Sequence, residues 1–153
     1  MGRWVVTTVP PGWTFLQGFG IRRNTADPRA VTASVGLGED GLAAEDALPE
    51  YIVRQRKLIE QTLKSTVFAG PQEVAFSNAD QALLFMVRHE LEGAGSMTHI
   101  QTYVRQSLWL GIVTFTAPHT EVPAARAGYD AFVKGLLIAP RAQAVQPNPA
   151  GQD

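Results

Sequence analysis

The sequence contains no cysteine, which excludes disulfide bonds, thiolate nucleophiles and thiolate-bound zinc. It has no uninterrupted apolar run of about 18 residues, so it predicts no helix that inserts into a membrane. The N-terminal segment MGRWVVTTVPPGW lacks the apolar core of a secretory signal. These features lead us to expect a cytoplasmic protein.

Charge is scarce and balanced. Lys and Arg number 13 against 14 Asp and Glu, charged residues make up 18% of the chain, and the net charge is −1. The densest basic patch, VRQRKL at 53–58, lies beside Glu50 and Glu60 and is typical of a solvated helix face. The sequence therefore predicts no nucleic-acid partner.

What is present indicates one globular domain. The 153 residues are 45% apolar, enough for a buried core. We expect a single domain over residues 1–138. The stretch 139–153 is rich in Pro, Gln and Ala with little apolar bulk, and we expect it to be a disordered tail.

The order of hydrophobic patterns predicts an α+β fold. β-branched or alternating stretches at 3–9, 19–24 and 30–37 predict strands, and a Gly-rich loop follows. The apolar stripe of 46–65 predicts a helix with Asp46 as its N-cap. Four more strands are predicted at 72–77, 81–91, 96–106 and 108–117, joined by tight turns into an antiparallel meander. A second helix is predicted at 121–138, and both helices are expected on one face of a sheet of about six strands.

The turns set a register for the meander. A three-residue turn at 93–95 places His89 opposite His99, and a two-residue turn at 106–107 places Tyr103 opposite Leu110. One face then holds Leu83, Phe85, Val87, His89, His99, Gln101, Tyr103, Leu110 and Ile112. The other holds Leu84, Met86, Ile100, Val104, Trp109, Gly111, Val113 and Phe115.

Both faces are apolar, so both need a cover. We expect the helices on the Trp109 face, because that face is uniformly apolar and Gly111 allows close approach. The face with His99 and Gln101 is apolar but carries hydrogen-bonding groups, which suits a surface covered by something else. Its cover is a partner, the N-terminal segment or a second copy of the chain.

Motifs for catalysis and cofactors are weak. GLGEDG at 36–41 matches a dinucleotide-binding pattern, but its two acidic residues and the antiparallel meander after it favour a flexible turn. His89 and His99 lack a third ligand for a metal. No serine lies in a nucleophile elbow. We therefore predict no enzyme, no catalytic residue, no metal and no cofactor.

Several short motifs carry a family resemblance across about residues 4–138. VPPGW, LPEYIVRQRKLIEQTL, ADQALLF, HIQTYVRQSLWLGIVTFTA and YDAFVKGLL occur in an order that resembles the PsbP-like fold. Within that fold the chain resembles the DcrB-related family, which includes the effector-associated (Eag) chaperones of type VI secretion. It departs from the family's Gln-x-Gln motif, where His99 takes the first position, and from an acidic position that is Phe15 here.

The resemblance implies a non-catalytic chaperone or adaptor that acts as a homodimer. Its concave sheet face would shield the N-terminal transmembrane helices of a secreted effector. The partner-binding residues would be Ile21, Phe85, Val87, His99, Gln101, Tyr103, Leu110 and Ile112. The alternative is a small-ligand-binding or protein-interaction module of the same fold with no secretion role.

Overall fold

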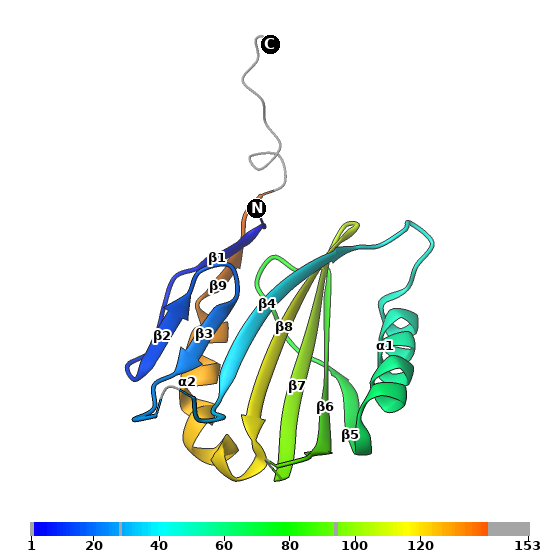
Figure 1. Cartoon of the computed structure of the whole chain (residues 1–153). Coiled ribbons are helices and arrows are strands. Elements are labelled where there is room, and N and C mark those ends of the chain that lie inside the picture. The colour runs from blue at the N-terminus through cyan, green and yellow to red at the C-terminus, as the bar shows by residue number, and fades with distance from the viewer. Residues whose placement is uncertain (1, 28, 94, 141–153) are drawn as a thin grey trace.

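The computed structural model describes residues 2–27, 29–93 and 95–140. The predicted tail, apart from residues 139 and 140, lies outside the described residues. The described part forms two sheets and two α-helices (Figure 1). The strands are β1 (Trp4–Val6), β2 (Trp13–Leu16), β3 (Gly20–Arg23), β4 (Ser34–Gly41), β5 (Lys64–Glu73), β6 (Gln81–Leu91), β7 (Gly95–Gln106), β8 (Trp109–Pro118) and β9 (Leu136–Ile138). The helices are α1 (Leu48–Thr62) and α2 (Val122–Lys134), the latter preceded by a 3₁₀ turn at His119–Glu121.

The large sheet has seven strands in the order β2-β3-β4-β8-β7-β6-β5, and every neighbouring pair is antiparallel. The predicted α+β class and the four-strand meander, β5 to β8, are confirmed. Strands β2 and β9 were not predicted; the second helix, predicted over 121–138, ends at Lys134, and Leu136–Ile138 form β9 instead. The prediction of a flexible turn at 36–41 is wrong, because β4 runs through Gly41 and pairs with β8 along its whole length.

Helix α1 is shorter than the predicted 46–65. Its N-cap is Ala47, without a side-chain capping bond, while the Asp46 carboxylate accepts a hydrogen bond from the Ala43 N–H at 3.1 Å. Pro49 suits the first turn, because its missing N–H would have no helical partner there. The chain enters β5 immediately after the helix, so the predicted strand 72–77 actually begins at Lys64.

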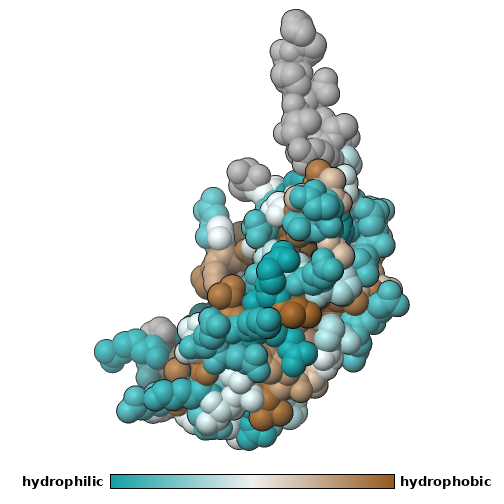
Figure 2. Space-filling model, turned by 90° about the vertical axis from the view of Figure 1, so that its right-hand side faces the viewer, coloured by the Kyte–Doolittle hydropathy of each residue, from teal (hydrophilic) through white to brown (hydrophobic). Residues whose placement is uncertain are grey.

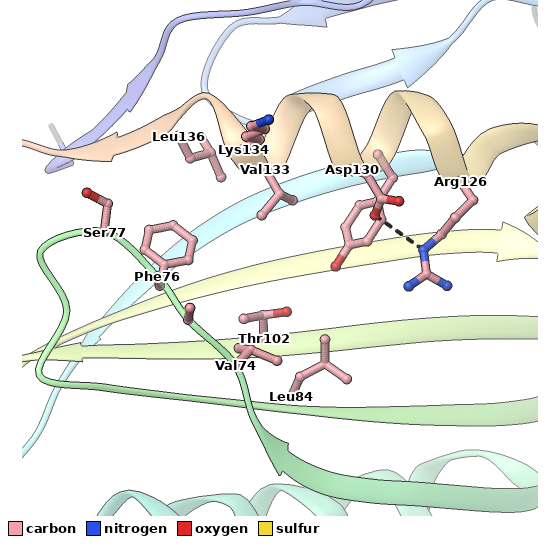
Figure 3. A pocket seen from close by; sticks show the side chains of 12 residues that line it. Val74, Phe76, Ser77, Leu84, Thr102, Arg126, Asp130, Val133, Lys134 and Leu136 are labelled. Carbon is pink, nitrogen blue, oxygen red and sulfur yellow. Dashed lines mark hydrogen bonds and ion pairs between the residues drawn. The ribbon is translucent and has the colours of Figure 1, made fainter.

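The two helices lie on opposite faces of the large sheet, so the prediction that both share one face is wrong. Helix α2 packs Tyr129 and Phe132 against Phe115 and its neighbours on the Trp109 face. Helix α1 packs Leu48, Tyr51 and Ile52 on the other face, against Phe85 and other β6–β8 residues. The sheet thus separates two cores, and Figure 3 shows α2 and α1 on either side of the strands.

The predicted register is displaced by two residues at both hairpins. Val87, not His89, is opposite His99, and Ile112, not Leu110, is opposite Tyr103. Each turn lies one residue from its predicted place, which shifts the pairing by two positions. Because side chains alternate with a period of two, the residues assigned to each face nevertheless stay there.

The small β1–β9 sheet closes one end of the Trp109 face. Trp4 makes an edge contact with Trp109, the ring centroids lying 5.3 Å apart, and the Trp4 Nε1–H donates to the Gly38 carbonyl at 2.9 Å. A Cβ at Gly111 would overlap both indole rings. Gly111 is therefore needed for close approach, although the group that approaches is this aromatic pair rather than a helix.

Candidate functional site

Four of the predicted partner-binding residues belong to the core beneath α1. Phe85, Val87, Tyr103 and Leu110 are each at most 2% exposed. Their cover is α1, whose Tyr51 ring makes an edge contact with the Tyr103 ring at 5.7 Å. The prediction that Phe85, Tyr103 and Leu110 are available to a partner is therefore wrong, since the apolar side of α1 covers them. Val87, although buried, also lines the hollow at the C-terminal end of α1.

Ile21 lies on the opposite face from the one predicted. It pairs with Val35 across β3 and β4, is fully buried, and belongs to the core that contains Tyr129 and Phe132 of α2. Its placement on the partner-binding surface is a second correction. The other three predicted residues, His99, Gln101 and Ile112, remain only half-buried on the face that α1 partly covers.

These three residues belong to a groove that α1 leaves open, which we call the cross-sheet groove. Two adjoining hollows, of about 340 and 400 Å³, meet at Thr116 and extend from the C-terminal end of α1 across β7 and β8 to β4. The groove is lined chiefly by Ile59, Leu63, His99, Gln101, Ile112, Thr114, Thr116, Ser34, Gly36, Gly38 and Phe19.

The floor of the groove is made of small or hydrogen-bonding side chains. Across β8 and β4, Thr114 is opposite Gly36 and Thr116 is opposite Ser34. Sequence reasoning missed these residues. The alternation of Ile112, Thr114 and Thr116 along β8 was the available signal, since it places two hydroxyls on the same face as Ile112.

Gln101 sits at the centre of the floor. Its side-chain carbonyl accepts a hydrogen bond from the Thr114 hydroxyl at 3.0 Å and a longer one from the Tyr103 hydroxyl at 3.5 Å. Its amide group has no hydrogen-bond partner among the described residues. The Thr114 and Tyr103 hydroxyls thus fix the side-chain carbonyl of Gln101, and its amide offers two N–H donors to an occupant of the groove.

His89 and His99 form a hydrogen-bonded pair at the α1 end of the groove. Their Nε2 atoms are 2.8 Å apart and their ring planes agree within 5°, an edge-to-edge arrangement. His89 Nδ1 faces the Glu90 carbonyl, which can only accept, so this nitrogen carries the proton. The His99 Nε2–H therefore donates to His89 Nε2, and His99 Nδ1 accepts from the Thr116 hydroxyl at 2.9 Å.

Burial of the His99 ring, and secondarily the charge of His89, lowers the pKa of His99 from 6.5 to about 4. The His99 ring is therefore neutral near pH 7. Among the described residues no three His, Asp or Glu side chains are grouped as metal ligands. The hydrogen bond within the pair, together with the contacts to the Glu90 carbonyl and the Thr116 hydroxyl, satisfies the ring nitrogens of both histidines.

Phe19 forms the far wall of the groove. Its ring lies against Gly36, where an added Cβ would be 3.2 Å from the ring, and it is 47% exposed. Phe15 and Leu16 on the neighbouring β2 are also exposed. Leu16, paired with Gly20 and through it with Gly36, extends the apolar surface on the groove face, whereas Phe15, paired with Ile21, lies on the opposite face.

The outer side of α1 differs from the groove. Figure 2 shows the side of the molecule that carries α1, where hydrophobic residues are scattered among hydrophilic ones. Val53 and Leu58 are the large apolar residues that α1 exposes. Neither helix of the described chain combines the length and hydrophobicity needed to cross a bilayer.

Comparison with known proteins identifies the fold. No protein-family model matches the chain, and no curated protein matches it. Among solved structures it is similar to LpqN, a Mycobacterium tuberculosis protein involved in cell envelope biogenesis, with a TM-score of 0.69 and 16% identity over 91% of this chain and 86% of LpqN.

Two other solved structures are similar to this chain in fold. PA94, a Pseudomonas aeruginosa protein of unknown function, has a TM-score of 0.61 and 17% identity, with 97% of this chain and 100% of PA94 covered. The cyanobacterial PsbP of Synechocystis sp. PCC 6803 has a TM-score of 0.53 and 7% identity, with 90% and 94% covered. At such identities the similarity concerns the fold alone: the chain has a PsbP-like α+β fold.

Proposed function

We propose that this protein is a non-catalytic chaperone or adaptor whose cross-sheet groove shields an apolar helix of a partner protein. The observation that carries the proposal is the strip of β7, β8 and β4 that α1 leaves uncovered on an otherwise buried sheet face. A partner that fills this strip would complete the cover.

The width of the strip suits one helix. Neighbouring strands are about 4.8 Å apart, so β7 to β4 spans roughly 10 Å. This matches the diameter of about 10–12 Å for a helix with its side chains. The end of α1, with Ile59 and Leu63, borders the strip on one side and Phe19 borders it on the other.

The chemistry of the strip suits an apolar helix with a few polar atoms. Gly38 and Ser34 permit close approach of a backbone, as small residues do between transmembrane helices, whereas the space above Gly36 is taken by the Phe19 ring. The Gln101 amide donates to an exposed carbonyl or a small polar side chain of the occupant. Ile112 and Leu63 supply apolar contact.

The resemblance to the Eag chaperones suggests the occupant. By that resemblance the partner is a type VI secretion effector with N-terminal transmembrane helices, and the protein acts as a cytoplasmic homodimer. His99 replaces the first Gln of the family motif. Its ring nitrogens bond to His89 and Thr116, so Gln101 alone of the two positions keeps donors for a partner.

The experiment is affinity copurification of the tagged protein from its native host. We compare wild type with Gln101→Ala, with Thr114→Trp, which fills the groove, and with Met86→Gln on the opposite face as the matched control. The expected result is a stoichiometric partner that contains apolar helices, is retained by Met86→Gln and is lost in both groove variants. Retention by folded Thr114→Trp protein would overturn the proposal.

A further inference from the structure

A second cavity lies on the other face of the sheet, beneath α2 (Figure 3). Its volume is about 400 Å³, near the lower end of the ~300–1,000 Å³ range of small-molecule sites. It shares no lining residue with the cross-sheet groove. Its apolar walls are formed by Val74, Phe76, Leu84, Val133 and Leu136.

The cavity exists because the chain after β5 leaves the sheet. Strand β5 ends at Glu73, and the Val74 N–H then bonds to the Ala82 carbonyl at 3.1 Å. Phe76 packs edge-on against Trp4, with the ring centroids 5.6 Å apart. The segment is thereby held away from α2, and Figure 3 shows the space between them above Leu84 and Thr102.

The floor of the cavity carries a pair of hydroxyl groups, those of Thr102 and Tyr129. Leu84 and Thr102 are cross-strand partners on β6 and β7, so both side chains point to the α2 side. The Tyr129 hydroxyl of α2 is hydrogen-bonded to Thr102. The hydroxyl groups at the floor are thus paired within the protein, and the charged side chains that line the cavity all come from α2.

The positively charged side chain of Arg126 lies at one end of the cavity. Arg126 uses its Nε to contact Asp130 Oδ1 at 3.3 Å, one turn along α2. Its guanidinium carbon lies 5.9 Å from the centroid of the Tyr129 ring. Its two Nη groups have no hydrogen-bond partner among the described residues, and Figure 3 shows them turned from Asp130 toward the strands. Lys134 also lines the cavity, so two cations and the single carboxylate of Asp130 give the rim a net positive charge.

We propose that this cavity binds a small amphiphilic carboxylate, with its hydrocarbon chain between α2 and β6 and its carboxylate on Arg126. The guanidinium presents two parallel N–H donors, which match a carboxylate in a bidentate pair. A neutral molecule of the same shape would gain no ion pair, because the half-exposed Arg126 guanidinium would keep its water contacts. The limited volume suits a medium-length chain rather than a long-chain lipid.

The test uses decanoate and decanol as probes, with binding followed by calorimetry and by methyl NMR signals of Leu84 and Val133. Wild type is expected to bind decanoate in a saturable one-to-one manner. Arg126→Gln is expected to weaken decanoate by about tenfold or more, the scale of a charged hydrogen bond. The affinity for decanol is expected to stay unchanged.

Three further variants locate the site. Arg29 is exposed and distant in sequence from Arg126, so Arg29→Gln is the matched charge control. This variant is expected to bind decanoate as wild type does. Val133→Trp fills the cavity and is expected to abolish binding of both probes. Thr114→Trp fills the cross-sheet groove and is expected to change neither. Absence of saturable decanoate binding, equal affinity in Arg126→Gln, or loss of binding in Thr114→Trp would overturn the proposal.

Discussion

Acid is expected to destabilise this protein through His99. In the folded chain the half-buried His99 ring accepts a hydrogen bond from Thr116 and donates one to His89. A second proton would have to enter at Nδ1 and displace the Thr116 hydroxyl proton from its acceptor. Burial therefore holds the pKa at about 4, while an unfolded chain takes up the proton at about 6.5.

The direction in which pH changes the free energy of unfolding depends on which state binds more protons. Below pH 6.5 the unfolded chain protonates His99 and the folded chain does not, so acid favours unfolding. The stabilisation is present in full above pH 6.5 and is lost as the pH falls toward 4. Between pH 7 and pH 5 the two pKa values give a loss of about 2 kcal/mol, and partial solvent screening of the ring reduces it to about 1–2 kcal/mol.

The assay is urea unfolding followed by tryptophan fluorescence at pH 7 and pH 5. Other groups of the chain also take up protons over this range, so the informative quantity is the difference between wild type and His99→Gln. Glutamine keeps a donor and an acceptor near His89 and does not titrate. The stability loss is expected to be smaller in His99→Gln by about 1–2 kcal/mol. An equal loss in both proteins would refute this assignment of the proton.

Three substitutions test the packing and the groove. Trp109→Ala should lower the free energy of unfolding by about 3–5 kcal/mol, measured by urea titration, because it empties the cluster beneath Trp4; a loss well under 1 kcal/mol would contradict that packing. Gly111→Ala should cost about 1–3 kcal/mol in the same assay, since its methyl group overlaps two indole rings; an unchanged midpoint would contradict the close approach. Gln101→Ala should cost about 1 kcal/mol or less and yet lose the copurified partner; unfolding without loss of the partner would make Gln101 structural.

The pattern of alternating side chains predicted the faces of the meander well. Both hairpin turns were misplaced by one residue, yet Gln101 and Ile112 stayed on the predicted face, because each displacement moved the pairing by two. The β-strand period thus carries more information than the turn positions do. Local turn chemistry alone did not select between neighbouring registers.

The positions of the helices and of β4 required tertiary information. An amphipathic stripe says that α1 buries one side, but not which sheet face receives it, and both faces here are apolar. The residues 36–41 have the composition of a loop, yet backbone pairing with β8 makes them a strand. The prediction for Ile21 was wrong because β3 was assigned to the partner-binding face without any predicted pairing between β3 and β4.

Site-specific photo-crosslinking in the native host tests the cross-sheet groove most directly. A benzophenone amino acid is placed at Phe19, on the exposed wall of the groove, or at Met86 on the other face, and the crosslinked peptides are identified by mass spectrometry. The proposal predicts that the probe at Phe19 captures an apolar helical segment of the copurified partner and that the probe at Met86 does not. Capture of that segment from Met86, with none from Phe19, would contradict the groove as the binding surface.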